Sequence, residues 1–230
     1  MRIRVLVEGR SEQRLLELWG PRAFPKHELI VHPHQGKGEI PGDPAAKPDG
    51  RHRGLLDQLP ATLRAFAGEP DTAVLVLVDA DNEDCRTLKK RLLTMVARVR
   101  PKPERLMFRI AVEETEAFYL GDLRGLKKAY PQANMRKARS YRPDSICGTA
   151  ELFGLVVQDD GLNKVAWAEA MGAVLTIRPE GSRSPSFRAL HQALVVLTTE
   201  RVPAPTKAAP KKRAKHWKSR YSSLRKQTDK

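Results

Sequence analysis

An unbroken apolar run from Ala73 to Val78, rich in valine, constrains the fold of this chain more than any other segment. Such a run is typical of a strand covered on both faces, as in parallel sheets, rather than of a half-exposed antiparallel strand. Asp79 and Asp81 come directly after it. Parallel sheets bind ligands outside the carboxyl ends of their strands, so we expect these carboxylates to lie where such a fold places its chemistry.

The two aspartates have two interpretations. Side chains alternate along a strand, so positions 79 and 81 point the same way, and two carboxylates so placed suit Mg²⁺. Alternatively, Asp81 or Asn82 caps the helix that follows. A cap needs only one such residue, whereas Asp79, Asp81 and Asp84 would repel one another without a cation. The pattern therefore favours a metal site.

Strand and helix patterns alternate over residues 1–121. Strands are expected at 2–7, 29–31, 73–78 and 106–112, and helices after Ser11, at 53–67, at 88–99 and at 117–120. A long loop without periodicity runs from 35 to 52. This order predicts an α/β fold with a mainly parallel sheet flanked by helices, of the Rossmann-like kind.

The pattern changes after Gly121. Residues 122–199 contain helical segments near 122–130, 145–157, 162–172 and 186–199, and we expect them to form a small helical lobe beside the α/β domain of residues 1–121. Residues 200–230 alternate Pro, Ala and Lys, a composition that cannot bury a core, so we expect a disordered tail.

The basic charge is concentrated in that tail. The chain carries a formal net charge of +15, and residues 201–230 contribute +10 of it, with eleven Lys or Arg against one acid. Basic residues interleaved with aromatics suit nucleic acid, through phosphate neutralisation and base stacking. Alternatively, the tail increases solubility or binds ribosomes nonspecifically and has no specific function. The candidate contacts are Lys211, Lys212, Arg213, Lys215, Trp217, Lys218 and Arg220.

No apolar stretch approaches the roughly 20 residues of a membrane span, and the amino terminus runs straight into a strand pattern without a signal peptide. Cys85 and Cys147 are too few for a disulfide framework, so reduced thiols are expected. We therefore expect a cytoplasmic protein that does not act on membranes.

Acidic residues follow three of the predicted strands. If those strands are parallel, the acids share one edge of the sheet. Glu12, one helical turn beyond Glu8, lies on the same side. The set predicts a site for Mg²⁺ or Mn²⁺ that could orient a water and stabilise the charge on a phosphodiester. Its members are Glu8, Glu12, Asp79, Asp81, Glu113 and Glu116.

These motifs resemble those of the Toprim domain, which topoisomerases, bacterial primases and the overcoming-lysogenization-defect (OLD) nucleases share. The resemblance rests on Val7-Glu8-Gly9-Arg10-Ser11-Glu12, on Val78-Asp79-Ala80-Asp81-Asn82 and on Ala111 to Phe118. Pro143-Asp144, Asn163 to Ala168 and Ser182 to Phe187 resemble an uncharacterised bacterial family of small Toprim-like proteins, often encoded beside an ATPase. Together the motifs cover residues 1 to about 197.

The resemblance implies a role for each acid. Glu8 corresponds to the Toprim general acid or base, and Asp79 and Asp81 to its metal-binding pair. Glu113 and Glu116 resemble a further acidic pair of the nuclease branch, for a second ion, although Glu114 leaves their register open. The chain has no evident topoisomerase tyrosine and no Gly-x-x-x-x-Gly-Lys-Ser/Thr motif, so alone it is neither a topoisomerase nor a motor.

Two functions remain. The first is a metal-dependent nuclease for DNA or RNA that works with a separate ATPase, in bacterial defence or repair. The second is a non-catalytic, nucleic-acid-binding subunit of an ATPase complex. Lys37 and Arg51 in the long loop, and Arg183 in a motif of the resemblance, are candidate phosphate contacts, although exposed basic residues are common on any protein.

Overall fold

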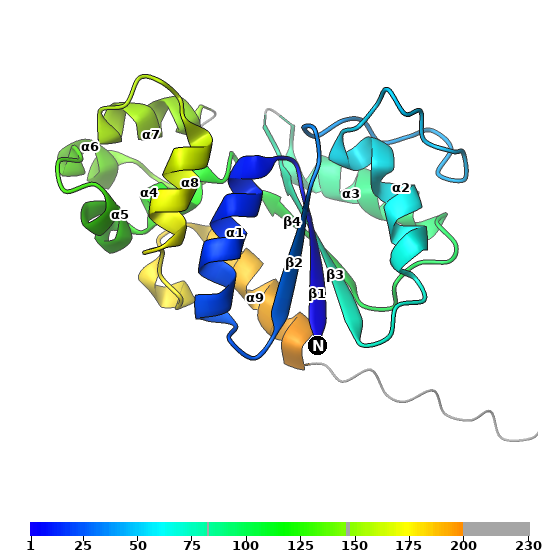
Figure 1. Cartoon of the computed structure of the whole chain (residues 1–230). Coiled ribbons are helices and arrows are strands. Elements are labelled where there is room, and N and C mark those ends of the chain that lie inside the picture. The colour runs from blue at the N-terminus through cyan, green and yellow to red at the C-terminus, as the bar shows by residue number, and fades with distance from the viewer. Residues whose placement is uncertain (82, 146–147, 200–230) are drawn as a thin grey trace, which may run out of the picture. The chain divides into compact units, whose positions relative to one another are not determined.

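Four parallel strands form the centre of the molecule, in the order β2-β1-β3-β4 (Figure 1). The computed structural model describes residues 1–81, 83–145 and 148–199. The strands are β1 (Arg2–Val7), β2 (Glu28–Pro33), β3 (Thr72–Asp79) and β4 (Leu106–Ala111), and every neighbouring pair is parallel. The predicted α/β fold with a parallel sheet is confirmed.

Helices follow the strands and fill the second half of the described chain. They are α1 (Arg10–Ala23), α2 (Leu55–Phe66), α3 (Cys85–Ala97), α4 (Glu116–Gly121), α5 (Leu123–Ala129), α6 (Met135–Ser140), α7 (Thr149–Val157), α8 (Lys164–Gly172), a 3₁₀ turn at Pro179–Gly181 and α9 (Pro185–Thr199). The sequence did not predict α6. Only Ala138 of its six residues is buried, so it has no apolar periodicity to detect.

Both faces of the sheet are covered, because successive strand residues enter different cores. Val5 and Leu75 join the core on the face of α1, whereas Leu6 and Val76 join the core under α2 and α3. All four side chains are fully buried. This two-sided burial explains why the run at 73–78 is continuously apolar rather than alternating.

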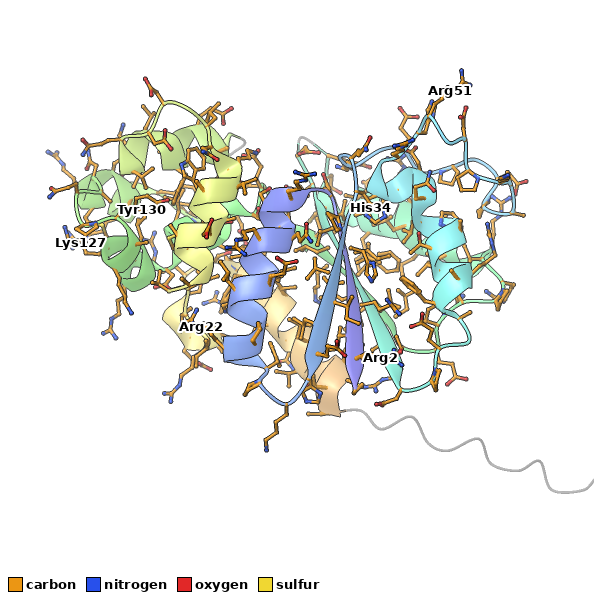
Figure 2. All side chains as sticks on the ribbon, viewed as in Figure 1. Arg2, Arg22, His34, Arg51, Lys127 and Tyr130 are labelled. Atoms are coloured by element: carbon orange, nitrogen blue, oxygen red, sulfur yellow. The ribbon has the colours of Figure 1, made fainter. Side chains whose placement is uncertain are left out.

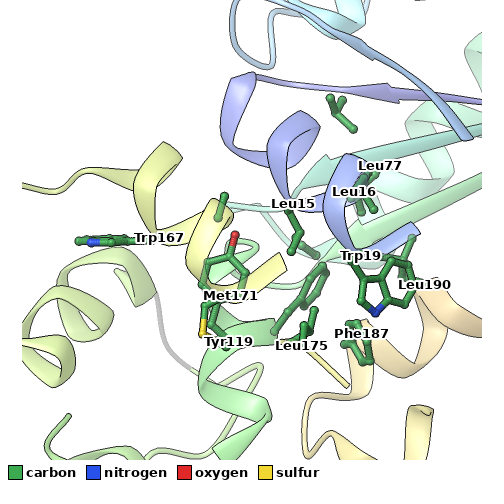
Figure 3. Close-up of a cluster of buried hydrophobic side chains, with 14 of the residues drawn as sticks. Leu15, Leu16, Trp19, Leu77, Tyr119, Trp167, Met171, Leu175, Phe187 and Leu190 are labelled. Atoms are coloured by element: carbon green, nitrogen blue, oxygen red, sulfur yellow. The ribbon is translucent and has the colours of Figure 1, made fainter. Parts of the chain in front are cut away.

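The α1 face of the sheet carries most of the aromatic packing (Figure 3). Trp19 of α1 lies edge-on to Phe187 of α9, with ring centroids 5.5 Å apart, and its Nε1 donates a 2.8 Å hydrogen bond to the carbonyl of Thr176. Trp167 of α8 packs against Phe153 of α7 in the same core. The helices of residues 122–199 thus share one core with the sheet, and residues 1–200 form a single compact unit.

The strand order creates a switch point between β1 and β3. The chain leaves β1 to add β2 on one side and later adds β3 on the other. In open α/β sheets the crevice at such a point, outside the carboxyl ends of the strands, is the usual ligand site. Glu8 follows β1 and Asp79 ends β3, so both acids flank this point.

No helix in the described ranges is long and apolar enough to cross a membrane.

Candidate active site

The two strands beside the switch point are joined by their acids. Glu8 is partly buried, and its Oε1 accepts a 2.8 Å hydrogen bond from the backbone N–H of Asp79. The backbone of Glu8 is held as well, since its carbonyl accepts from Gly36 N–H at 2.9 Å. The carboxylate predicted as general acid or base therefore lies directly against the predicted metal-binding pair.

Asp79 lies within the electrostatic field of four other acids. Burial raises its pKa well above the usual value, and the charges of neighbouring carboxylates raise the pKa further. A carboxyl group surrounded by like charges keeps its proton more tightly, because its ionised form is destabilised. The acids responsible are Glu8, Glu12, Glu116 and Asp81.

Glu8 is poised to exchange a proton near neutral pH. Burial raises its pKa to about 7, against the lowering effect of the Asp79 N–H bond. The charge of Asp81 raises the pKa as well, and that of Lys37 lowers it. A carboxyl group with such a pKa suits general acid or base catalysis.

Glu12 points into the same cluster from the first turn of α1. It is buried, and its Oε1 accepts hydrogen bonds from Ser11 Oγ at 2.8 Å and Thr115 Oγ1 at 3.3 Å. A Cβ at position 9 would lie 3.3 Å from Glu12 Oε2, so Gly9 leaves room for this carboxylate. The helix expected after Ser11 begins at Arg10, so Ser11 lies inside it and does not cap it; its hydroxyl donates to Glu12 instead.

Glu116 is the most deeply buried member of the cluster. It is 1% exposed, and burial raises its pKa to about 7. Its Oε1 has no hydrogen-bond partner among the described residues, and its Oε2 lies 4.0 Å from Lys164 Nζ. A buried acceptor without a donor costs about 1–3 kcal/mol, so this oxygen is a candidate ligand atom.

Glu114, between the two glutamates of the predicted pair, has a different role. It accepts hydrogen bonds from Lys164 Nζ at 2.9 Å, Thr149 Oγ1 at 3.1 Å and Ala150 N–H at 2.9 Å. Although burial opposes ionisation, these bonds lower the pKa of Glu114. Glu114 therefore holds the start of α7 and the lysine of α8 beside the cluster.

Glu113 is buried and accepts a hydrogen bond from the hydroxyl of Tyr141, the residue that ends α6. Glu113 and Glu116 thus both turn inward, while Glu114 between them pairs with a cation. Through the bond from Tyr141, Glu113 lies beside the end of α6.

Asp81 lies at the open side of the cluster. Its side chain is 52% exposed, and its Oδ2 lies 3.0 Å from Lys37 Nζ, which also donates to the carbonyl of Ala80. Its positive φ of 52° shows that the chain has left the strand, so strand alternation does not set its direction. Asp84 provides the helix cap by accepting from Thr87 N–H at 2.8 Å, so the capping interpretation of Asp81 is wrong.

Arg51 and Arg183, two further predicted nucleic-acid contacts, have partners outside this cluster. Arg51 projects from the long loop and pairs with Asp49 at 2.7 Å (Figure 2). Arg183 donates to the carbonyl of Tyr141 and has its own N–H bound to Gly121 O, so it holds two segments of the fold together. The tail contacts Lys211, Lys212, Arg213, Lys215, Trp217, Lys218 and Arg220 lie outside the described residues.

The cluster fits a hard divalent cation by its donors. Carboxylate oxygens are the ligands that Mg²⁺ prefers, and an ion would offset the mutual repulsion around Asp79 and provide a partner for Glu116 Oε1. In the positions that the described side chains occupy, no three His, Cys, Asp or Glu form a ready set of ligands. The acids therefore affect one another electrostatically, but their described oxygens do not surround a common point as the ligands of a bound ion would.

Sequence reasoning gave Lys164 little weight and missed Tyr141. Lys164 is the first residue of α8, where Asn163 caps the helix by accepting from Ala166 N–H. The positive end of the helix dipole disfavours a cation there, so a lysine at that position needs acidic partners. This signal could have found Lys164. The Tyr141 contact depends on tertiary packing and leaves no mark in the sequence.

Comparisons with known proteins give one match. A family model described as "Domain of unknown function (DUF4276)" matches residues 7–195, which include every acid of the cluster. Neither the curated proteins nor the solved structures contain a match to this chain. Because the model spans most of the sequence, the chain belongs to the family described as Domain of unknown function (DUF4276).

Proposed function

We propose that the chain is a Mg²⁺- or Mn²⁺-dependent nuclease that hydrolyses phosphodiester bonds in DNA or RNA. The observation that carries this proposal is the convergence of acidic charge on Asp79, which ends a central strand at the switch point. A buried cluster of like charges is costly to maintain, and perturbed carboxyl groups of this kind are concentrated at functional sites.

Asp79, Asp81, Glu12 and Glu116 are the residues that would hold the ion. When bound, a divalent cation neutralises charge on the phosphate and lowers the pKa of a bound water. The carboxylates would have to turn toward a shared point to enclose it, and Glu116 Oε1 is a buried carboxylate oxygen with no hydrogen-bond partner among the described residues.

Glu8 would move the proton. With a pKa of about 7, a large fraction of Glu8 is ionised at neutral pH and can accept a proton from the water that attacks phosphorus. The Asp79 N–H bond fixes one carboxylate oxygen, which orients the group. The other residues near the cluster position the acids: Thr115 holds Glu12, and Lys164 lies beside Glu114 and Glu116.

The resemblance of the three acidic motifs to the Toprim domain supports the same assignment. By that resemblance alone, we propose that the nuclease works with a separate ATPase, in bacterial defence or repair.

The test is a cleavage assay on supercoiled plasmid, single-stranded DNA and RNA with Mg²⁺ or Mn²⁺. The native chain should cleave at least one substrate, and an Asp79→Asn/Asp81→Asn variant should not. Asp84→Asn is the matched control, because Asp84 caps α3 and asparagine caps a helix equally well. Full cleavage by the double variant would overturn the proposal.

A non-catalytic, nucleic-acid-binding subunit is the second candidate, and the two lysines favour it. Lys37 already pairs with Asp81, and Lys164 with Glu114, so part of the acidic charge is neutralised without an ion. Under this candidate the native chain binds nucleic acid but cleaves none of the three substrates with either metal.

A further inference from the structure

The helices α5 and α6 carry a dense set of cations with almost no acids. Residues 122–142 contain seven Lys or Arg and one acid, Asp122. That acid is buried and accepts from Gly125 N–H at 2.9 Å and Thr176 N–H at 2.7 Å, so it is used within the fold. The exposed cations are Arg124, Lys127, Lys128, Arg136, Arg139 and Arg142.

Among the described residues, none of these six cations has an acidic partner, whereas several cations elsewhere on the molecule do. Arg14 pairs with Glu169, and Arg91 pairs with Glu83, at 2.6 and 2.7 Å. Within residues 1–81, 83–145 and 148–199, none of the six forms an ion pair. Like charges held close together on a surface favour a polyanionic ligand.

Part of this set lines a shallow depression. Its volume is about 550 Å³, and its lining residues are Leu123, Arg124, Lys127, Lys128, Met135 and Arg139. Figure 2 shows Lys127 projecting outward from the side of the helical layer that lies away from the sheet. The leucine and methionine in the lining are partly buried, and the other four lining residues are exposed cations.

The row of cations also ends beside Glu113, an acid of the turn after β4. Tyr141 ends α6 and donates its hydroxyl hydrogen bond to Glu113, and Arg142 is the next residue. A chain of phosphates bound along α5 and α6 would therefore be led toward the carboxylate edge of the sheet.

We infer that the α5–α6 surface, defined by Arg124, Lys127, Lys128, Arg136, Arg139 and Arg142, binds the phosphodiester backbone of a nucleic acid. This inference rests on the proposed function and names the surface that would hold its substrate. Nucleic-acid interfaces are polar and strongly positive.

A protein partner would instead be expected to use an apolar centre. The exposed large apolar residues of the described chain lie on other elements: Leu93, Leu155, Leu162, Val165 and Ile177.

Helix α3 provides a matched control. Its exposed Arg86, Lys89 and Lys90 also line a shallow depression, but α3 packs on the opposite face of the sheet. The two full-length variants to compare are Lys127→Ala/Lys128→Ala/Arg139→Ala and Arg86→Ala/Lys89→Ala/Lys90→Ala. Each removes three positive charges from exposed positions, and neither alters residues 200–230, so any contribution of the tail is the same in both.

Binding is measured by fluorescence anisotropy with a labelled 20-base-pair duplex and a 20-base single strand, from 50 to 200 mM salt. Both triple variants carry Asp79→Asn/Asp81→Asn, so that cleavage cannot consume the probe. Since each lost phosphate contact lowers the slope of log K against log salt by about 0.9 for a duplex, the α5–α6 variant should lower it by about 2–3. Its Kd should rise at least about tenfold at the lowest salt, and the α3 variant should change the slope by less than about 1.

Three outcomes would overturn the inference: an unchanged slope in the α5–α6 variant, an equal effect of the two variants, or equally tight binding of a polyglutamate peptide of matched charge. Restored affinity in Lys127→Arg/Lys128→Arg/Arg139→Lys, with an unchanged unfolding temperature in all variants, would support it. The inference and the proposed function fail separately. If the α5–α6 variant binds with a reduced salt dependence but the native chain cleaves nothing, only the proposed nuclease activity is refuted. If the native chain cleaves but the salt dependence of the variant is unchanged, only the binding role of this surface is refuted.

Discussion

The carboxylate of Glu8 accepts a 2.8 Å hydrogen bond from the backbone N–H of Asp79 and thereby joins the ends of β1 and β3. The bond crosses the point where the strand order reverses, so two segments 71 residues apart meet where α/β sheets usually bind ligands. The charge of Glu8 raises the pKa of Asp79, whereas the hydrogen bond from Asp79 N–H lowers the pKa of Glu8. The ionisation of Glu8 and that of Asp79 are therefore coupled.

Glu8→Gln should remove the pH dependence of cleavage near neutrality. A general base acts only when ionised, and the pKa of Glu8 is about 7, so native kcat/KM should rise with pH through this value. The glutamine variant should lose about 10²- to 10⁴-fold in rate and show no such rise. Initial rates from pH 5.5 to 8.5 at saturating Mg²⁺ check this. A rise that persists in the variant would assign the titration to another group.

Glu116→Gln should change how stability depends on pH. The pKa of Glu116 is raised from its usual 4.5 to about 7, so the unfolded chain loses this proton at lower pH than the folded protein. Raising the pH from about 4.5 to about 7 therefore destabilises the native protein, and the penalty is complete above pH 7. At about 1.36 kcal/mol for each unit by which the pKa is displaced, the full penalty is on the order of 3.4 kcal/mol, of which roughly 2.5 kcal/mol develops between pH 5 and pH 8.

The measurement is the free energy of unfolding by urea at pH 5 and pH 8, in chelator, for both proteins. From pH 5 to pH 8, the free energy of unfolding of the variant should rise, relative to that of the native chain, by the amount given for this interval. Comparing differences removes the contribution of groups common to both, such as His32 and His191, whose lowered pKa values act in the opposite direction. Parallel pH profiles would show that Glu116 is ionised normally in the folded protein.

The same repulsion predicts stabilisation by a divalent ion. An ion that binds the folded chain at a hundred times its Kd stabilises it by about 2.7 kcal/mol, which raises Tm by roughly 5–10 °C for a protein of this size. Mg²⁺ or Mn²⁺ at pH 8 should raise the Tm of the native chain and of Asp84→Asn but not of Asp79→Asn/Asp81→Asn. Because this readout does not need catalysis, it tests the ion site under either proposed function. Equal shifts in all three proteins would place the ion elsewhere.

The sequence was sufficient to predict the parallel sheet and to place Glu8 and Asp79 at one edge of it. Buried strands leave an apolar run, and the carboxyl ends of parallel strands must share an edge, so both follow from local pattern and topology. The directions of Glu113, Glu114 and Glu116 did not follow from the sequence. Glu113 and Glu114 lie on the short turn after β4, and Glu116 begins α4. Their directions depend on Tyr141, which follows α6, and on Lys164 of α8, both far along the chain. These directions are determined by tertiary contacts that no local sequence pattern records, and the same holds for the small helix α6.

Lys164→Met should destabilise the protein more at pH 8 than at pH 5. The lysine pairs with Glu114 at 2.9 Å, and its charge lowers the pKa of Glu116, so its loss leaves two partly compensated acids in the interior. At pH 5, Glu116 stays protonated, so it carries no buried charge that lacks a cation. At pH 8, either the buried carboxylate is ionised or it binds a proton at a pH above its pKa, and both lower the free energy of unfolding.

The expected loss at pH 8 is about 1–3 kcal/mol, the range for leaving a buried hydrogen-bonding group without its partner. Lys164→Arg keeps the charge and should recover most of the stability, whereas Arg14→Met, which breaks the exposed pair with Glu169, should cost less than about 1 kcal/mol. Urea unfolding of the four proteins at both pH values makes the comparison. A loss that is the same at pH 5 and pH 8 would mean that Lys164 contributes through the packing of its methylene chain rather than through its charge.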